Sequence, residues 1–128
     1  MQMNPIGWFE IYVDDMARAK AFYEAVFKVR LEKLDNETEI DIEMWVFPCE
    51  MDSYGATGAL CSMSGVKAGG NSTMVYFSCE DCETEASLAA ANGGALQVPK
   101  MAIGQHGFIS VVSDTEGNTI GVAFYELK

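Results

Sequence analysis

Two stretches of the chain share one pattern of hydrophobic and polar positions. The first, FEIYVDDMARAKAFYEAVF at residues 9–27, starts with a strand-like alternation, passes two aspartates and continues with apolar residues at helical spacing. The second, VYFSCEDCETEASLAAANGG at residues 75–94, repeats this layout, and its Asp81 stands 66 positions after Asp15 in a chain of 128 residues. Asp14 and Asp15 both suit the N-cap of the first helix. The pattern therefore predicts a duplicated strand–helix unit.

Three further strands are expected after each helix. The predicted strands and helices are 8–13, 16–27, 29–34, 39–47 and 58–63 in the first half, and 73–79, 82–92, 95–101, 107–113 and 118–127 in the second. Turns are predicted at DNET (35–38) and DTEGN (114–118), and the glycine pair at 93–94 can end the second helix through a left-handed C-cap. We expect one domain over residues 1–128, with module 1 at 5–63, a glycine-rich linker at 64–72 and module 2 at 73–126.

Two βαβββ modules predict an α+β fold. One helix covers only one face of a four-stranded sheet, so the other face must be buried elsewhere or line a cavity. Two modules that form a curved mixed sheet would enclose a central cleft, and concave, partly apolar clefts are where small molecules bind. The repeat therefore favours a small-molecule ligand over an extended protein-binding surface.

Composition and charge narrow the classes of partner. Apolar residues make up 49% of the chain and charged residues 21%, which is typical of a packed interior. The formal net charge of −11 would repel phosphate backbones and anionic membranes, so neither nucleic acid nor membrane is an expected partner. No apolar run is long enough to cross a bilayer, and MQMNPIGW lacks the pattern of a secretion signal, so a cytoplasmic protein is expected.

Four cysteines stand at positions 49, 61, 79 and 82, the last two in the motif CEDC. A redox or zinc function is one interpretation, because the motif lies where a strand meets a helix. Against it, Glu80 and Asp81 disfavour a thiolate, and no second pair of cysteines or histidines completes a tetrahedral zinc site. Cys79 also shares the parity of apolar neighbours, which favours simple burial.

Two sequence motifs resemble a known superfamily. The V-x-D…A-x-x-F-Y run from Val13 to Tyr23, and SDTEGNTIGV at 113–122, resemble the vicinal oxygen chelate superfamily, which includes glyoxalase I, extradiol dioxygenases and bleomycin-resistance proteins. GWFEIYVDD, PKMAIGQHGFISVVSDTEGN and the glycine-rich middle are similar to its glyoxalase-related bacterial branch. The resemblance implies the paired-module fold and a homodimer, and it raises lyase activity as an expectation.

The resemblance also implies where a metal would bind. Metal-using members hold a divalent ion with His, Gln or Glu from the first and last strands of each module. Those positions fall on Trp8, Met74 and Gly121, with the fourth near Ala59. None of these residues supplies the oxygen or nitrogen ligands that such a cation prefers. We therefore expect no metal and no other cofactor.

Two residues are candidates for acid–base chemistry. Glu10 alternates with Trp8 and Tyr12 on the face opposite the predicted helix, and a carboxylate among aromatic rings loses solvation, which suits a general base. His106, the only histidine, lies between two glycines, and histidine is the side-chain type most often used for proton transfer. The alternatives are an edge-strand carboxylate that reaches water and an exposed loop histidine without a role.

Four aromatic residues share the parity assigned to the uncovered face. They are candidates for stacking on a planar or cationic ligand, and ordinary core packing is the alternative for each: Trp8, Tyr12, Trp45 and Tyr76.

Two functions that involve a small molecule remain open, beside a third in which the binding partner is another protein. One is a metal-independent lyase or isomerase that moves a proton next to a carbonyl group. The other is a binding protein of the bleomycin-resistance kind, which sequesters a cationic or aromatic compound without reaction. No nucleotide-binding or nucleophile-elbow motif is present.

Overall fold

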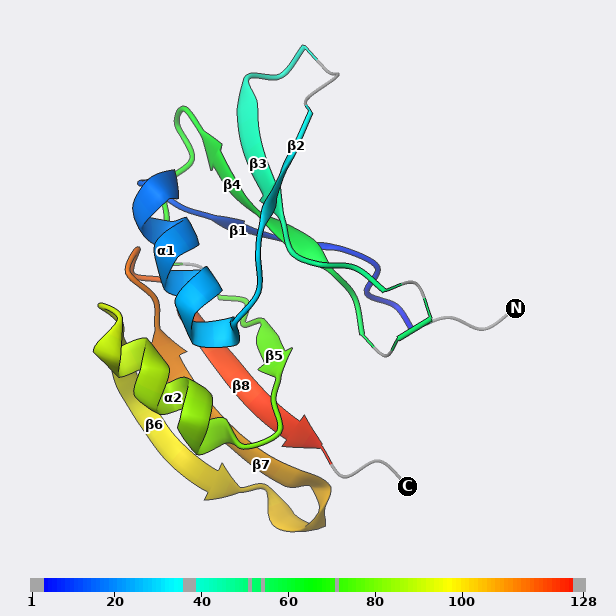
Figure 1. The fold of residues 1–128 in the computed structure, drawn as a ribbon, viewed down its shortest axis with the longest axis vertical. Coiled ribbons are helices and arrows are strands. Elements are labelled where there is room, and N and C mark those ends of the chain that lie inside the picture. Colours follow the sequence, from blue (N-terminus) through cyan, green and yellow to red (C-terminus); the bar gives the residue numbers. More distant parts are fainter. Residues whose placement is uncertain (1–3, 36–38, 51, 54, 71, 126–128) are drawn as a thin grey trace.

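The computed structural model describes residues 4–35, 39–50, 52–53, 55–70 and 72–125 (Figure 1). Its elements, in chain order, are β1 (Phe9–Tyr12), α1 (Met16–Phe27), β2 (Glu32–Leu34), β3 (Ile42–Val46), β4 (Gly58–Met63), β5 (Tyr76–Ser78), α2 (Cys82–Ala91), β6 (Ala95–Ala102), the short 3-10 helix η1 (Gly104–His106), β7 (Gly107–Ser113) and β8 (Thr119–Tyr125). Residues 36–38 of the predicted DNET turn and residues 126–127 of the predicted last strand lie outside the described residues.

The strands form two mixed four-stranded sheets, with the orders β1-β4-β3-β2 and β5-β8-β7-β6. The first strand of each module pairs in parallel with the last, so that Ile11 lies beside Leu60 and Phe77 beside Val122. The remaining pairs are antiparallel. The prediction of an α+β fold built from two βαβββ modules is therefore confirmed.

Several strands are shorter than the sequence predicted. The strand predicted at 73–79 forms only over Tyr76–Ser78, and the strand predicted at 29–34 only over Glu32–Leu34. Both lie at a sheet edge with one neighbour, so fewer backbone hydrogen bonds hold their ends. The edge strand β6 accommodates Pro99, which has no N–H to donate, through a shift of register between Val98 and Met101.

Both helices begin at an aspartate N-cap, and α2 ends at a glycine. The Asp15 carboxylate accepts a hydrogen bond from the Arg18 amide at 3.1 Å, and the Asp81 carboxylate accepts one from the Glu83 amide at 3.1 Å. After α2, Gly93 takes a left-handed conformation (φ 98°), which confirms the glycine C-cap expected from the sequence.

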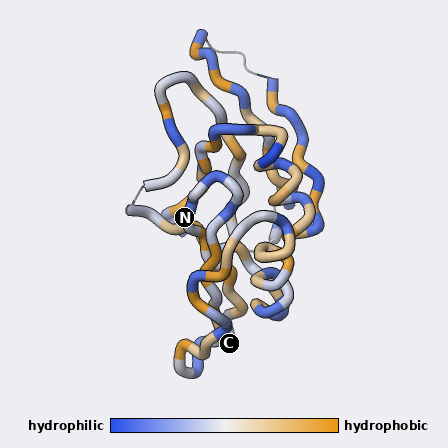
Figure 2. Tube along the Cα trace, turned by 90° about the vertical axis from the view of Figure 1, so that its left-hand side faces the viewer, coloured by the Kyte–Doolittle hydropathy of each residue, from blue (hydrophilic) through white to orange (hydrophobic). Residues whose placement is uncertain are grey.

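An aromatic core joins the two modules. Phe77 from β5 stacks on Phe27 of α1 at 4.3 Å between ring centroids, and its ring also lies within 6 Å of Phe9, Tyr23 and Phe47 from module 1. The helices α1 and α2 contact each other, and α2 packs against β6, β7 and β8 (Figure 1). Figure 2 shows the underlying alternation of hydrophobic and polar residues along the chain.

The turn between β7 and β8 holds module 1 against module 2. Buried Asp114 accepts a hydrogen bond from the Tyr23 hydroxyl at 2.7 Å. The Asn118 side chain donates to the Tyr12 carbonyl at 3.0 Å and accepts from the Gly69 amide at 2.7 Å. One polar turn of module 2 thus bonds to the first strand and first helix of module 1 and to the linker.

Glu116 of the same turn makes the densest set of these contacts. Its two carboxylate oxygens accept from the amides of Asp14 and Asp15, from the Arg18 guanidinium at 2.7 and 3.0 Å, and from the Thr115 hydroxyl. Burial alone would raise the pKa of Glu116, but these hydrogen bonds outweigh it and lower the pKa to about 2. The relative position of the modules therefore depends on an ionised glutamate.

Within the described residues, neither helix is long and apolar enough to span a bilayer.

Candidate functional site

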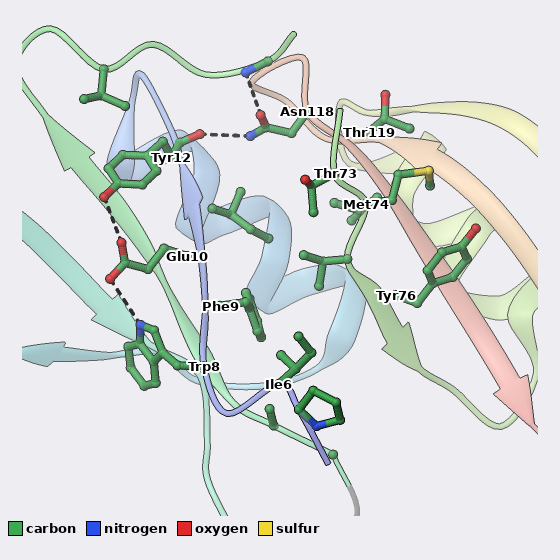
Figure 3. Close-up of a pocket in the computed structure, with 18 of the residues that line it drawn as sticks. Ile6, Trp8, Phe9, Glu10, Tyr12, Thr73, Met74, Tyr76, Asn118 and Thr119 are labelled. Atoms are coloured by element: carbon green, nitrogen blue, oxygen red, sulfur yellow. Dashed lines mark hydrogen bonds between the residues drawn. The ribbon is translucent and has the colours of Figure 1, made fainter. Parts of the chain in front are cut away.

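A pocket of about 1060 Å³ lies where the two modules meet (Figure 3). One wall is β1 with the residues that precede it, and the other is the segment leading into β5 together with the start of β8. The linker contributes Val66, Lys67 and Gly69. The hydrogen bonds of Asn118 to the Tyr12 carbonyl and the Gly69 amide run along one end, so the turn that joins the modules also shapes the pocket.

Trp8, Glu10 and Tyr12 form a carboxylate clamp on the first wall. Trp8 directly precedes β1, and the three side chains alternate with their neighbours, so that they project from the same face of this segment, away from α1. The Tyr12 hydroxyl donates to Glu10 Oε1 at 2.8 Å, and Trp8 Nε1 donates to Glu10 Oε2 at 3.2 Å. Because each oxygen accepts only one of these bonds, the carboxylate keeps lone pairs for a ligand while its direction is fixed. The sequence-based placement of these three side chains on the uncovered face is confirmed.

The clamp is suited to binding a cation. The hydrogen bond to Glu10, with burial and the Glu10 charge, raises the pKa of Tyr12 to about 12, so the hydroxyl stays protonated and remains a donor. Cys61 lies beside Tyr12 on the neighbouring strand β4, where burial and the Glu10 charge raise the pKa of its thiol to about 12, so this thiol does not supply a nucleophile at neutral pH. A fixed carboxylate flanked by an indole and a phenol can pair with a positive group while the rings contact an apolar surface.

Tyr76 lies on the opposite side of the pocket, on β5, close to Met74 (Figure 3). Its ring rests on β8 at Gly121, where a Cβ atom would collide with the ring. A glycine inside this strand therefore creates the space that Tyr76 occupies. Trp8 and Tyr76 are 42% and 41% exposed, so both rings remain available to a ligand.

The structure corrects the placement of Trp45. Its neighbour in the sheet is Leu60, on the face that α1 covers, and the Lys20 ammonium lies 3.4 Å from the ring centroid. The indole nitrogen donates to Glu43 at 2.9 Å. The error arose because β3 carries an apolar residue at nearly every position, so that alternation alone did not say which side α1 would cover. Met44, and not Trp45, shares the face of Glu10.

His106 does not meet Glu10 in the chain. Its 3-10 helix joins β6 to β7 and is exposed, and the neighbouring Gly107 pairs with Tyr125 at the far end of β8. The pocket lies at the other end of that strand, at Thr119, about 20 Å away for a strand of this length. Figure 1 shows the β6–β7 connection and β1 in separate parts of the molecule. The two candidates for acid–base chemistry are therefore not brought together within one chain.

Several pocket residues were not expected from the sequence. Phe9 and Ile6 line the pocket although Phe9 has the opposite parity to Glu10, because β1 is an edge strand and both of its sides approach the junction. Asn118 was recognised only as part of a turn. The sequence feature that could have revealed Asn118 as a site residue is the DTEGN motif, which has more polar side chains than a hairpin turn needs.

The side chains at the four positions where metal-using members of the superfamily bind their ion decide whether this chain can hold one. Trp8 and Met74 line the pocket, whereas Ala59 and Gly121 lie on β4 and β8 beside Glu10 and Tyr76. Indole, thioether and methyl groups do not provide the hard ligands of a divalent ion. In the described part of the chain, no three His, Cys, Asp or Glu side chains converge on a common point. These residues do not fit a metal of the superfamily's kind.

Comparisons with known proteins identify the family to which this fold belongs. A family model described as the Glyoxalase/Bleomycin resistance protein/Dioxygenase superfamily matches residues 5–122. The chain matches no curated protein.

Solved structures share the fold. Glyoxalase I from Zea mays superposes with a TM-score of 0.71 at 17% identity, over 94% of this chain and 46% of the maize chain, so this chain spans about half of that protein. A glyoxalase/bleomycin resistance protein from Albidiferax ferrireducens T118 gives a TM-score of 0.66 at 18% identity, over 94% of this chain and 99% of the other. TnmS3, an antibiotic binding protein from Streptomyces sp. CB03234, gives 0.65 at 20% identity, over 98% and 99%. The chain belongs to the glyoxalase/bleomycin resistance protein/dioxygenase superfamily.

Proposed function

We propose that this protein binds a small aromatic compound that carries a positive charge, and that it holds the compound without converting it. The observation that carries the proposal is the clamp of Trp8, Glu10 and Tyr12, in which two aromatic donors orient one carboxylate on the pocket wall. The exposed ring of Tyr76 on the other side provides a second aromatic surface.

Charge supports a cationic ligand. The chain carries a formal net charge of −11, which attracts cations to the whole molecule. Glu10 is the negative group that a cation would contact inside the pocket. Lys67 also lines the pocket, so a ligand with a separate acidic group could be accommodated away from the clamp. The antibiotic-binding fold neighbour TnmS3 shows that this architecture serves a binding protein elsewhere.

Three related probes test the proposal: aminoacridine, which is cationic at neutral pH, neutral acridine, and anionic acridine carboxylate. Isothermal titration calorimetry is expected to rank the cation first. Glu10→Gln should weaken binding of the cation about tenfold or more, equivalent to about 1.4 kcal/mol, and should leave acridine unchanged. Glu32→Gln is the matched control, because Glu32 is exposed on the same face of the sheet outside the pocket. Equal affinity for cation and anion, or an unaffected Glu10→Gln variant, would overturn the proposal.

The lyase or isomerase alternative keeps one supporting feature. Glu10 is a carboxylate of fixed orientation in a pocket, which is what a general base requires. The other acid–base candidate, His106, is distant, so the proton would have to be returned by Glu10 itself. Wash-in of deuterium from heavy water into a panel of small hydroxyketones, followed by NMR, distinguishes the two functions. A purely binding protein gives no wash-in, whereas exchange that disappears in Glu10→Gln would establish the catalytic function in its place.

We also propose that two copies of the chain pair through the faces that the helices leave uncovered. Large apolar side chains are exposed on these faces, among them Leu34 on one sheet and Met101 on the other, at 43% and 48%. Burying such surface in a symmetric partner is the ordinary way to remove it from water. Sedimentation velocity is expected to give a dimer for the native chain and a monomer for Leu34→Glu. A native chain that stays monomeric at high concentration would refute the pairing.

A further inference from the structure

The end of β5 and the start of α2 bring two thiols together. Cys79 follows β5, where its amide donates to the Ala123 carbonyl at 3.0 Å, and Cys82 is the first residue of α2. Their Sγ atoms lie 3.0 Å apart. This is closer than two sulfur atoms normally approach without a bond or a shared hydrogen. The ligand pocket makes no use of either residue.

We propose that Cys79 and Cys82 are a redox-active dithiol, which closes reversibly to an intramolecular disulfide by exchange with a low-molecular-weight disulfide such as oxidised glutathione. The Cys79 thiolate attacks one glutathione sulfur and releases one reduced glutathione, and a mixed disulfide forms at Cys79. Cys82 then attacks Cys79 Sγ and releases the second glutathione, so the two thiols lose two electrons and two protons, and one molecule of oxidised glutathione is reduced.

Access and order of attack follow from burial. Cys79 is partly exposed, whereas Cys82 is buried and its thiol points at the Phe108 and Val122 carbonyls, at 3.4 and 3.6 Å. Cys79 therefore reacts first with an external disulfide, and Cys82 resolves the mixed disulfide from within. Both cysteines lie on the side of the second sheet that α2 covers. A dimer formed through the uncovered sheet faces would therefore not block access to them.

The charged surroundings slow the reaction but favour its product. Burial, the contact with Cys82 and the negative charges of Glu85 and Asp81 raise the pKa of Cys79 well above its usual value. With a raised pKa, little of the Cys79 thiolate is present at neutral pH, which slows its attack on an external disulfide. The surroundings that raise the pKa do not stabilise the reduced state, so the equilibrium favours the disulfide. Lys100 from β6 pairs with Asp81 at 2.9 Å and offsets only that charge.

After burial and the contact with Cys82, Glu85 is the charged neighbour that raises the pKa of Cys79 most. Its Oε1 atom is buried and accepts no hydrogen bond from the described residues, and burial raises the pKa of its carboxyl group. Asp81 and Glu80 add to this effect, whereas Lys28, which follows α1, opposes it. Neutralising Glu85 should therefore make the Cys79 thiolate easier to form.

The test equilibrates the whole protein in glutathione buffers at pH 8, alkylates the remaining thiols and examines tryptic peptides by mass spectrometry. Cleavage after Lys67 and Lys100 gives peptide 68–100, in which Cys79 and Cys82 are the only cysteines. In oxidising buffer this peptide is expected to lose two hydrogens and to carry neither glutathione nor alkyl group. Cys82→Ser should trap one glutathione on Cys79, and Cys49→Ser should leave the result unchanged.

Rates add a second, independent readout. Glu85→Gln is expected to raise the rate of disulfide formation at pH 7 several-fold and to shift its rise with pH to lower pH, whereas Glu83→Gln on the exposed side of α2 should not. The wild-type peptide decides the proposal even if Cys82→Ser fails to fold. Two alkylated cysteines in wild-type peptide 68–100 from oxidising buffer, or a stable glutathione adduct at Cys79, would overturn it.

Discussion

Replacing Glu116 by Gln should show how much of the fold depends on the ionised turn between β7 and β8. The substitution keeps the size of the side chain but exchanges one acceptor oxygen for an NH2 group. Whichever oxygen is replaced, the new donor faces the Arg18 guanidinium, and at least one further donor among Asp14, Asp15 and Thr115 loses its partner. A buried donor without an acceptor, or an unpaired charge, is costly.

The magnitude can be worked from the pKa of Glu116. Its fall from the ordinary value of 4.5 to about 2 corresponds to about 3.4 kcal/mol of preference for the ionised form in the folded state. The Glu116 side chain is fully buried, but that of Arg18 is 53% exposed, so solvent screens part of this interaction. We expect the free energy of unfolding to fall by about 2 to 3 kcal/mol at pH 7.

Because the folded-state pKa is depressed, this stabilisation is fully present above pH 4.5 and disappears as the pH falls from 4.5 towards 2. Urea unfolding, followed by tryptophan fluorescence at fixed protein concentration, should therefore show a large difference between wild type and Glu116→Gln at pH 7 and a small one near pH 2.5. Glu50→Gln, an exposed loop substitution, is the control and should change stability by less than about 0.5 kcal/mol. Equal unfolding midpoints for Glu116→Gln and wild type at pH 7, or a difference that does not depend on pH, would refute the reasoning.

Three further substitutions test the core and the pocket. Tyr23→Phe removes the 2.7 Å bond to buried Asp114 and should cost about 1.5 to 3 kcal/mol in urea unfolding; a change below 0.5 kcal/mol would contradict the inferred strength of that bond. Phe77→Ala empties the centre of the aromatic core and should cost about 3 kcal/mol, measured in the same way, with a negligible effect arguing against a core shared by the modules. Gly121→Ala should displace the Tyr76 ring and weaken aminoacridine binding in calorimetry, whereas Gly7→Ala, where a Cβ meets nothing within 4 Å, should not; equal binding by both variants would remove Tyr76 from the site.

The sequence predicted the helices and strands better than it predicted how they pack against one another. The duplicated pattern predicted both helices, an aspartate cap for the first and the glycine end of α2, because these depend on hydrogen bonds within a few residues of one another. The same alternation placed Glu10 with Trp8 and Tyr12, since side chains two apart in a strand must share a face. Part of the candidate site was therefore predictable from local geometry.

The errors concern relations between elements. Trp45 was assigned to the wrong face because an apolar strand can be covered from either side, and only the packing of α1 with Lys20 decides which. His106 was grouped with Glu10, although the register of β7 on β8 sends its loop to the end of the sheet away from the pocket. DTEGN was read as a turn, and its bonds to Tyr12, Tyr23 and Arg18 were not foreseen.

By itself, the sequence determined the duplicated module, the ends of each helix that are capped locally, and the shared face of Trp8, Glu10 and Tyr12. Only the tertiary structure decided that Trp8 and Tyr12 bond to Glu10, which face of β3 α1 covers, and which polar groups of module 2 hold module 1. The physical reason is that hydrophobic burial specifies how much surface is removed from water but has no direction, whereas the buried hydrogen bonds of Glu116, Asp114 and Asn118 require one particular arrangement of partners about a hundred positions away in the chain.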